Sequence, residues 1–149
     1  MKFVIQCTTQ VSVTIDQKLY SEIGKGFLVL IGICDEDTKE TADKMVRKLI
    51  GMRIFSDENG KTNLALKDVD GQLLLVSQFT LYADCKKGNR PSFVKAGSPQ
   101  HANELYEYII DACKKEVPVV KTGVFGAEME VALINDGPFT IILDSKDLA

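Results

Sequence analysis

A buried strand that ends in polar side chains is the first place in this sequence where chemistry could occur. The continuous apolar run Leu73–Val76 has the length of a strand that is buried on both faces. Ser77, Gln78 and Thr80 follow it without a Gly or Pro break. Because an unpaired buried hydroxyl or amide costs about 1–3 kcal/mol, these groups must find partners or serve a function. We therefore expect this strand end to form one wall of a site.

A second strand pattern, over 129–144, is interrupted in its middle. The apolar residues of 131–134 stop at Asn135-Asp136-Gly137-Pro138, and the pattern resumes after them. These four residues are typical of a turn between two strands, and composition alone favours that interpretation. The functional alternative is that Gly137 lets a ligand approach the backbone closely, while Pro138 fixes the direction of a carbonyl. This stretch is the expected second wall.

The hydroxyl groups of Ser77 and Thr80 have no evident base. The single histidine, His101, falls in the first turn of a predicted helix, where a surface position is expected, and no carboxylate precedes the hydroxyls locally. Since a nucleophilic hydroxyl needs a base, these groups either form hydrogen bonds or leave catalysis to backbone N–H groups and the substrate. Free N–H groups at a strand end can form an oxyanion hole worth about 2.7–4 kcal/mol per donor. That would suffice to cleave an activated ester.

Composition excludes several classes of site. The net charge is −3, so a broad groove for long nucleic acid is not expected, and RNA contact would need a small end or a local basic patch. The four cysteines lack CxxC spacing and one histidine cannot build a multi-histidine zinc site, so we expect free thiols, no metal and no cofactor. The longest apolar run, 27–34, is too short to cross a membrane, and the N-terminus lacks a signal-peptide pattern. A cytoplasmic location is expected.

The elements that position these residues follow from periodicity. The 149 residues suit a single domain spanning 1–149. Asp37 and Glu40 have capping-box spacing ahead of a helix over 38–52, and Ser98 with Pro99 begins a second helix. We expect a mixed α/β fold of three layers, with both helices on one face of a sheet and further strands on its other side. The predicted strands are 2–7, 11–15, 19–23, 27–33, 53–55, 73–76, 117–122, 129–134 and 139–143.

Two groups of cations could meet an anionic ligand. Lys86, Lys87 and Arg90 lie within the loop 85–91, directly after the polar strand end. A solvated surface loop is the favoured interpretation in isolation, and the position raises the alternative of an anionic substrate. The basic residues of the first helix are expected to form a solvated face. They are Lys39, Lys44, Arg47 and Lys48.

Both interrupted strands resemble one family. The segment from Ser77 to Leu81 matches the SQxxL motif, and the segment from Asn135 to Thr140 matches the NxGPxT motif, of the D-aminoacyl-tRNA deacylases. The resemblance spans essentially the whole chain, including its length and the segments 90–93 and 123–126. The related deacylases that act on L-alanine carry a different pair of motifs, so the D-specific branch is implied.

The resemblance implies a homodimer that hydrolyses the ester between a D-amino acid, or glycine, and the terminal adenosine of tRNA, with its site at the subunit interface. Ser77, Gln78, Phe79 and Thr80 would be catalytic, with the backbone N–H groups of Phe79 and Thr80 near the scissile carbonyl. Gly137-Pro138, expected cis, would reach into the other subunit's pocket. Its carbonyls would hold the substrate's α-amino group and leave no room for an L side chain.

The remaining implied contacts lie near the substrate. Phe125 and Met129 match positions that hold the adenine, and Asn135 belongs to the substrate-binding set with the Gly-Pro pair. Two positions depart from the family pattern: Cys7 stands where an arginine is usual, and Phe139 replaces a smaller aliphatic residue. Any support that the arginine gives to the Gly-Pro segment must here come from elsewhere.

The sequence therefore predicts a cofactor-free hydrolase, a D-aminoacyl-tRNA deacylase that proofreads translation in the cytoplasm without a metal. Its catalysis would rest on an oxyanion hole and the substrate's ribose 2′-hydroxyl. The alternative mechanism uses Thr80 as a covalent nucleophile. The alternative function is a non-catalytic module that binds the 3′ end of RNA.

Overall fold

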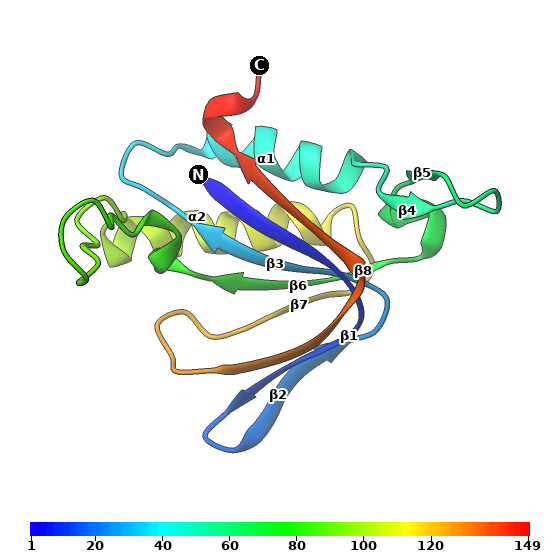
Figure 1. The fold of residues 1–149 in the computed structure, drawn as a ribbon, viewed down its shortest axis with the longest axis horizontal. Coiled ribbons are helices and arrows are strands. Elements are labelled where there is room, and N and C mark those ends of the chain that lie inside the picture. Colours follow the sequence, from blue (N-terminus) through cyan, green and yellow to red (C-terminus); the bar gives the residue numbers. More distant parts are fainter.

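The longest elements of the structure are two antiparallel strands, β1 (Lys2–Ile15) and β8 (Glu130–Asp144). In this computed structural model, which describes residues 1–149, they pair with each other from Lys2↔Asp144 to Thr14↔Glu130. The other edge of β1 has two partners in succession, because β3 (Gly26–Gly32) pairs with its first half and β2 (Lys18–Ile23) with its second. One strand therefore belongs to two parts of the fold (Figure 1).

The six-stranded sheet continues beyond β3 with parallel pairing. β6 (Gln72–Ser77) lies next to β3, and β7 (Val120–Thr122) lies next to β6. β8 pairs only with β1, so its outer edge has no partner strand. A separate two-stranded ribbon is formed by β4 (Phe55–Ser56) and β5 (Thr62–Leu64). Short 3₁₀ helices cover Leu66–Val69 (η1), Phe79–Tyr82 (η2) and Ser145–Asp147 (η3).

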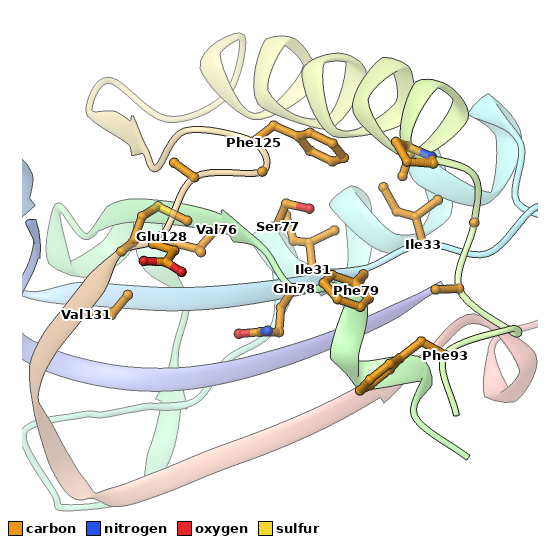
Figure 2. Close-up of a pocket in the computed structure, with 17 residues that line it drawn as sticks. Ile31, Ile33, Val76, Ser77, Gln78, Phe79, Phe93, Phe125, Glu128 and Val131 are labelled. Carbon is orange, nitrogen blue, oxygen red and sulfur yellow. The ribbon is translucent and has the colours of Figure 1, made fainter. Parts of the chain in front are cut away.

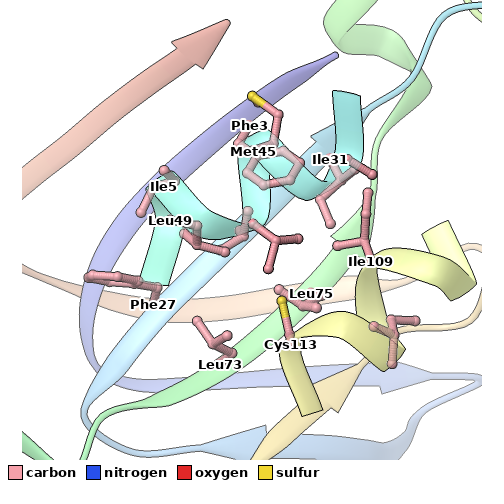
Figure 3. Close-up of a cluster of buried hydrophobic side chains, with 14 of the residues drawn as sticks. Phe3, Ile5, Phe27, Ile31, Met45, Leu49, Leu73, Leu75, Ile109 and Cys113 are labelled. Carbon is pink, nitrogen blue, oxygen red and sulfur yellow. The ribbon is translucent and has the colours of Figure 1, made fainter. Parts of the chain in front are cut away.

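Both long helices cover the same face of the sheet. α1 (Lys39–Gly51) and α2 (Pro99–Lys114) lie over β3 and β6 (Figure 1). Their buried stripes meet the inward side chains of β1, β3 and β6 in the main hydrophobic core (Figure 3). Because every residue from Leu73 to Val76 is at most 2% exposed, β6 is buried on both faces, as predicted.

A second, smaller core lies on the opposite face of β3 and β6. There Leu28, Leu74 and Val76 pack against Val11 and Val13 from the second half of β1. The sheet thus curls until its second half lies beneath its first half, and the helices form the third layer (Figure 1). The predicted mixed α/β class with two helices is confirmed. The strands below the central layer belong to the same sheet, because β1 and β8 are long enough to run through both layers.

Several predicted boundaries differ from the observed ones. The segments 2–7 and 11–15 form one strand, because β1 stays paired with β8 across the residues between them. The segments 129–134 and 139–143 are likewise one strand, β8. The predicted strand 117–122 shortens to β7, the part that pairs with β6. Of the predicted strand 53–55 only Phe55 is in a strand, because β4 begins there and continues to Ser56, where its partner β5 lies.

The cap of α1 also differs from its prediction. The capping box is formed by Thr38 and Thr41, one residue later than the predicted pair Asp37 and Glu40. Asp37 is buried because its carboxylate has other partners: Oδ1 accepts a hydrogen bond from the Met1 ammonium at 2.7 Å, and Oδ2 accepts one from the backbone N–H of Cys34 at 2.8 Å. At the start of α2, Pro99 takes the first helical position as predicted, but the Ser98 side chain forms no capping hydrogen bond.

Candidate active site

A cavity of about 630 Å³ lies where β6 ends, bounded by the start of α2 and by the loop between β7 and β8 (Figure 2). Its wall consists of 17 residues, of which 11 are hydrophobic. Five of the nine predicted site residues belong to this wall, although they come from separate parts of the chain. They are Ser77, Gln78, Phe79, Phe125 and Met129.

The strand end that carries Ser77 is held from both sides. The Leu75 carbonyl accepts hydrogen bonds from the Tyr106 hydroxyl of α2 at 2.7 Å and from the Gly123 backbone N–H at 3.1 Å. Burial raises the pKa of Tyr106, so its hydroxyl stays protonated and can donate. The parallel ladder ends where Gln78 N donates to the Ile31 carbonyl at 2.7 Å. These bonds fix β6 relative to both other walls of the cavity.

The backbone N–H groups of Phe79 and Thr80 are free at this point. The first hydrogen bond of η2 is donated by Leu81 N to the Gln78 carbonyl at 3.3 Å, and no side chain caps the helix. The donors that precede such a first bond have no partner within the helix. Phe79 lines the cavity, so its free backbone donor lies at the wall, and the free donor of Thr80 is next to it in the chain.

The Thr80 side chain lies outside the cavity wall. It is exposed, and its hydroxyl accepts a hydrogen bond of 2.6 Å from Nε2 of Gln78. No histidine or carboxylate is bonded to it. His101, predicted to be a surface residue, is half-buried because its Nε2 lies 2.9 Å from the Asp37 carbonyl, away from the cavity.

Phe125 and Met129 line the cavity from the loop between β7 and β8. Figure 2 shows Phe125 across the cavity from Phe79. The Phe125 ring lies 6.2 Å from the Tyr106 ring, measured between centroids. The Met129 sulfur accepts a hydrogen bond from Val124 N at 3.4 Å, and a Cβ at Gly123 would come within 2.6 Å of that sulfur. The glycine therefore allows Met129 to fold against its own loop. An aromatic ring and a thioether on one wall suit a flat, apolar ligand.

The Asn135-Asp136-Gly137-Pro138 segment is neither a turn between two strands nor part of this cavity. Pairing with β1 moves from Thr8↔Asn135 to Gln6↔Thr140, so residues 136–139 bulge out of one continuous strand. The Gly137-Pro138 bond is cis, as expected, and both residues are exposed. Because the pair does not line its own chain's cavity, the functional alternative requires the cavity of another copy of the chain.

Asn135 closes the base of this bulge. Its Oδ1 accepts a hydrogen bond from Phe139 N at 2.7 Å, and its Nδ2 donates to the Thr140 hydroxyl at 2.9 Å. Cys7 lies opposite, at the break in register, where burial and the Asp136 carboxylate raise the pKa of its thiol to about 11. The thiol is therefore neutral near pH 7 and cannot provide the charge of an arginine. In this chain, the support of the bulge comes from Asn135.

Some residues that line the cavity were not predicted from the sequence. Phe93 lines the wall and meets the Phe79 ring edge-on, with centroids 5.2 Å apart. Glu128 is the one charged side chain in the wall. Their positions in the sequence could have indicated that they line the site, because each lies within or beside a segment that carries the family resemblance. No group of three or more His, Cys, Asp or Glu residues is arranged to hold a metal ion, and no helix is long and apolar enough to cross a membrane.

Comparison with known proteins assigns the fold and the family. The family described as D-Tyr-tRNA(Tyr) deacylase matches residues 4–144. The chain belongs to this family. It is 51% identical over 146 residues to the D-aminoacyl-tRNA deacylase of Clostridium novyi (strain NT), and 50% identical over 146 residues to that of Clostridium acetobutylicum (strain ATCC 824), with 98% of each chain covered in both cases. The predicted family membership is confirmed, and with it the prediction of a hydrolase of the D-aminoacyl-tRNA deacylase class.

Two solved structures share the fold of this chain. A structure described as c-Myc DNA Unwinding Element Binding Protein has a TM-score of 0.91 and 41% identity, covering 97% of this chain and 98% of that one. A structure described as a probable eukaryotic D-amino acid tRNA deacylase has a TM-score of 0.80, covering 95% of this chain and 97% of that one. Its identity is 18%, so it supports the fold alone.

Proposed function

We propose that this chain hydrolyses the ester that joins a D-amino acid, or glycine, to the terminal adenosine of tRNA, and that the cavity at the end of β6 is the site. The observation that carries the proposal is that two segments line one cavity. Ser77, Gln78 and Phe79 lie on one side, where the backbone N–H groups of Phe79 and Thr80 are free, and Phe125 with Met129 provides an apolar surface from the other segment. The first group suits a carbonyl that becomes an oxyanion, and the second suits an adenine ring.

The chemistry needs few protein groups. The substrate carbonyl oxygen would accept hydrogen bonds from the N–H groups of Phe79 and Thr80, which stabilise the negative charge that forms when water attacks the carbonyl carbon. As the bond to the ribose oxygen breaks, the neighbouring ribose hydroxyl passes its proton to that oxygen and takes up a proton from the attacking water. The products are the free amino acid and tRNA. An activated ester permits this route without a metal or cofactor.

A second copy of the chain would complete the site. β8 is a 15-residue edge strand without a partner on its outer side, and Ile134 and Ile142 on it are 58% and 71% exposed. A long edge with exposed apolar side chains is normally covered. Gly137-Pro138 projects from the same strand, so a partner could receive it in its cavity. There its carbonyls would bind the α-amino group and exclude an L side chain, whereas glycine, which has no side chain, would pass.

The whole chain, residues 1–149, would act as one deacylase domain. Because aminoacyl-tRNA is made and used in translation, we place its proofreading work in the cytoplasm. DNA binding, which the description of the 41% identical structure names, is disfavoured here by a net charge of −3. A non-catalytic RNA-end binding module is the other rival. It would bind uncharged tRNA and leave the ester of D-Tyr-tRNA intact, whereas the proposal requires ester loss, with EDTA present.

The Thr80→Ala variant separates the two mechanisms. The Thr80 hydroxyl is exposed and bonded only to Gln78, so its loss should leave kcat for D-Tyr-tRNA within about tenfold, because a single neutral hydrogen bond contributes roughly 0.5–1.5 kcal/mol. Single-turnover hydrolysis measures the effect. Abolished turnover, together with an acyl-enzyme trapped on the native protein, would establish Thr80 as the nucleophile and overturn the oxyanion-hole mechanism.

A further inference from the structure

The loop that follows η2 carries a cluster of positively charged side chains in an acidic protein. The net charge of the chain is −3, yet residues 84–95 contain four cations and a single carboxylate. Lys86, Lys87 and Arg90 are exposed and form no ion pair. Lys95 is different, because its Nζ lies 3.3 Å from Oδ2 of Asp84. Three neighbouring cations are therefore left unneutralised by the protein.

The base of this loop is closed by hydrogen bonds. Asp84 N donates to the Ser92 carbonyl at 2.7 Å, and Ser92 N donates to the Asp84 carbonyl at 2.9 Å. The Asp84 carboxylate also accepts a hydrogen bond from Lys86 N at 3.0 Å. This bond and the Lys95 ammonium lower the pKa of Asp84. The loop is thus anchored at a defined place.

That place is the edge of the cavity. Phe93 directly follows the closing pair and lines the cavity with Phe79 (Figure 2). Arg90 is three residues from Phe93, so their Cα atoms are at most roughly 10 Å apart. A nucleic-acid strand advances about 3.4 Å per nucleotide along a helix axis, so the cations are within reach of the first few phosphates of a strand whose end enters the cavity.

We propose that Lys86, Lys87 and Arg90 bind the phosphates of the tRNA acceptor end while its terminal nucleoside ester occupies the cavity. This inference rests on the proposed function and adds the part of the substrate that the cavity cannot hold. Phosphate contacts position a nucleic acid without reading its sequence. The loop should therefore favour every tRNA equally and act on substrate binding, leaving the chemical step unchanged.

The test replaces all three cations with glutamine and uses two substrates. One is D-Tyr-tRNA, and the other is the D-tyrosyl ester of adenosine, which has the same ester and no phosphate. The matched control is a second triple variant, which combines Lys44→Gln, Arg47→Gln and Lys48→Gln. These three exposed cations lie on α1, and none lines the cavity. Circular dichroism and thermal unfolding verify that both variants fold.

For the loop variant we expect KM for D-Tyr-tRNA to rise at least about tenfold, with kcat retained. The steepness of log(kcat/KM) plotted against log salt concentration should fall by about two, since each single-strand phosphate contact contributes roughly 0.7. The loop variant should hydrolyse the adenosine ester with native kcat and KM, and the α1 variant should hydrolyse both substrates with native values. An unchanged KM for D-Tyr-tRNA, or equal losses on both substrates, overturns the inference and leaves the proposed function standing. If the native protein cleaves neither ester, the proposed function itself fails, and the inference fails with it.

Discussion

Replacing Phe79 with proline should lower kcat for D-Tyr-tRNA by about 10²–10³-fold beyond the loss caused by Phe79→Ala, the range observed when one oxyanion-hole donor is removed. Proline lacks the N–H group, and it is tolerated at the first turn of a helix, where Phe79 lies. The preceding residue, Gln78, has φ −141° and ψ 85°, which is outside the α region that a following proline disfavours. Single-turnover hydrolysis measures the difference.

The alanine variant is the matched control because it removes the same ring and keeps the donor. It accounts for the lost contacts with Phe93 and with the cavity. Equal kcat values for the alanine and proline variants, with both proteins folded, would show that the Phe79 N–H stabilises no charge during the reaction. The catalytic part of the proposal would then be wrong.

The second large effect concerns Gly137. Its φ is +143°, and a Cβ at this position would come within 2.8 Å of the Phe139 backbone nitrogen. Gly137→Ala should displace the bulge and lower the ratio of D-ester to L-ester hydrolysis about tenfold or more, because strain of this kind costs of order 1–3 kcal/mol. Gly137 is exposed and belongs to neither hydrophobic core, so the cores should be preserved.

In the proposed dimer, mixed pairs of variants test whether this segment works in the partner's cavity. A Phe79→Pro subunit keeps an intact Gly137-Pro138, and a Gly137→Ala subunit keeps an intact cavity. Differently tagged and purified as a heterodimer, the pair should form one complete site and regain about half of the native D-ester kcat per dimer with native selectivity. Selectivity equal to that of the Gly137→Ala protein alone would show that each subunit uses its own segment.

The fold was predictable where periodicity alone determines an element. β6 and both helices were predicted from apolar runs and stripes, since burial requires those patterns. The single long β8 was not, because Asn135-Asp136-Gly137-Pro138 has the composition of a turn whether the chain reverses or bulges. What decides is the partner strand: β1 pairs with residues on both sides of the bulge. Such long-range pairing leaves no local signal.

The cap of α1 shows the same limit at a smaller scale. Asp37 has the right spacing for a cap, but its carboxylate is bound elsewhere. One oxygen accepts from the Met1 ammonium, 36 residues away in the sequence, and the other accepts from the backbone N–H of Cys34, which precedes the helix. Thr38 is then free to cap. Sequence spacing identifies the residues that could cap a helix, and hydrogen bonds to the rest of the fold determine which of them does.

The candidate site was predictable only in part. The polar end of β6 was recognisable from the cost of burying unpaired groups, and the resemblance to a family added Phe125 and Met129, which alone would read as core. Phe93 and Glu128 enter the wall through loops whose path depends on tertiary contacts. The separation of Gly137-Pro138 from its own cavity could not be derived from spacing.

The proposed D-ester hydrolysis is tested most directly by incubating D-Tyr-tRNA and L-Tyr-tRNA with the purified protein, side by side and with EDTA present. We expect rapid loss of the D ester, while the L ester decays only at its spontaneous rate. Survival of both esters, or equal enzymatic loss of both, would contradict it.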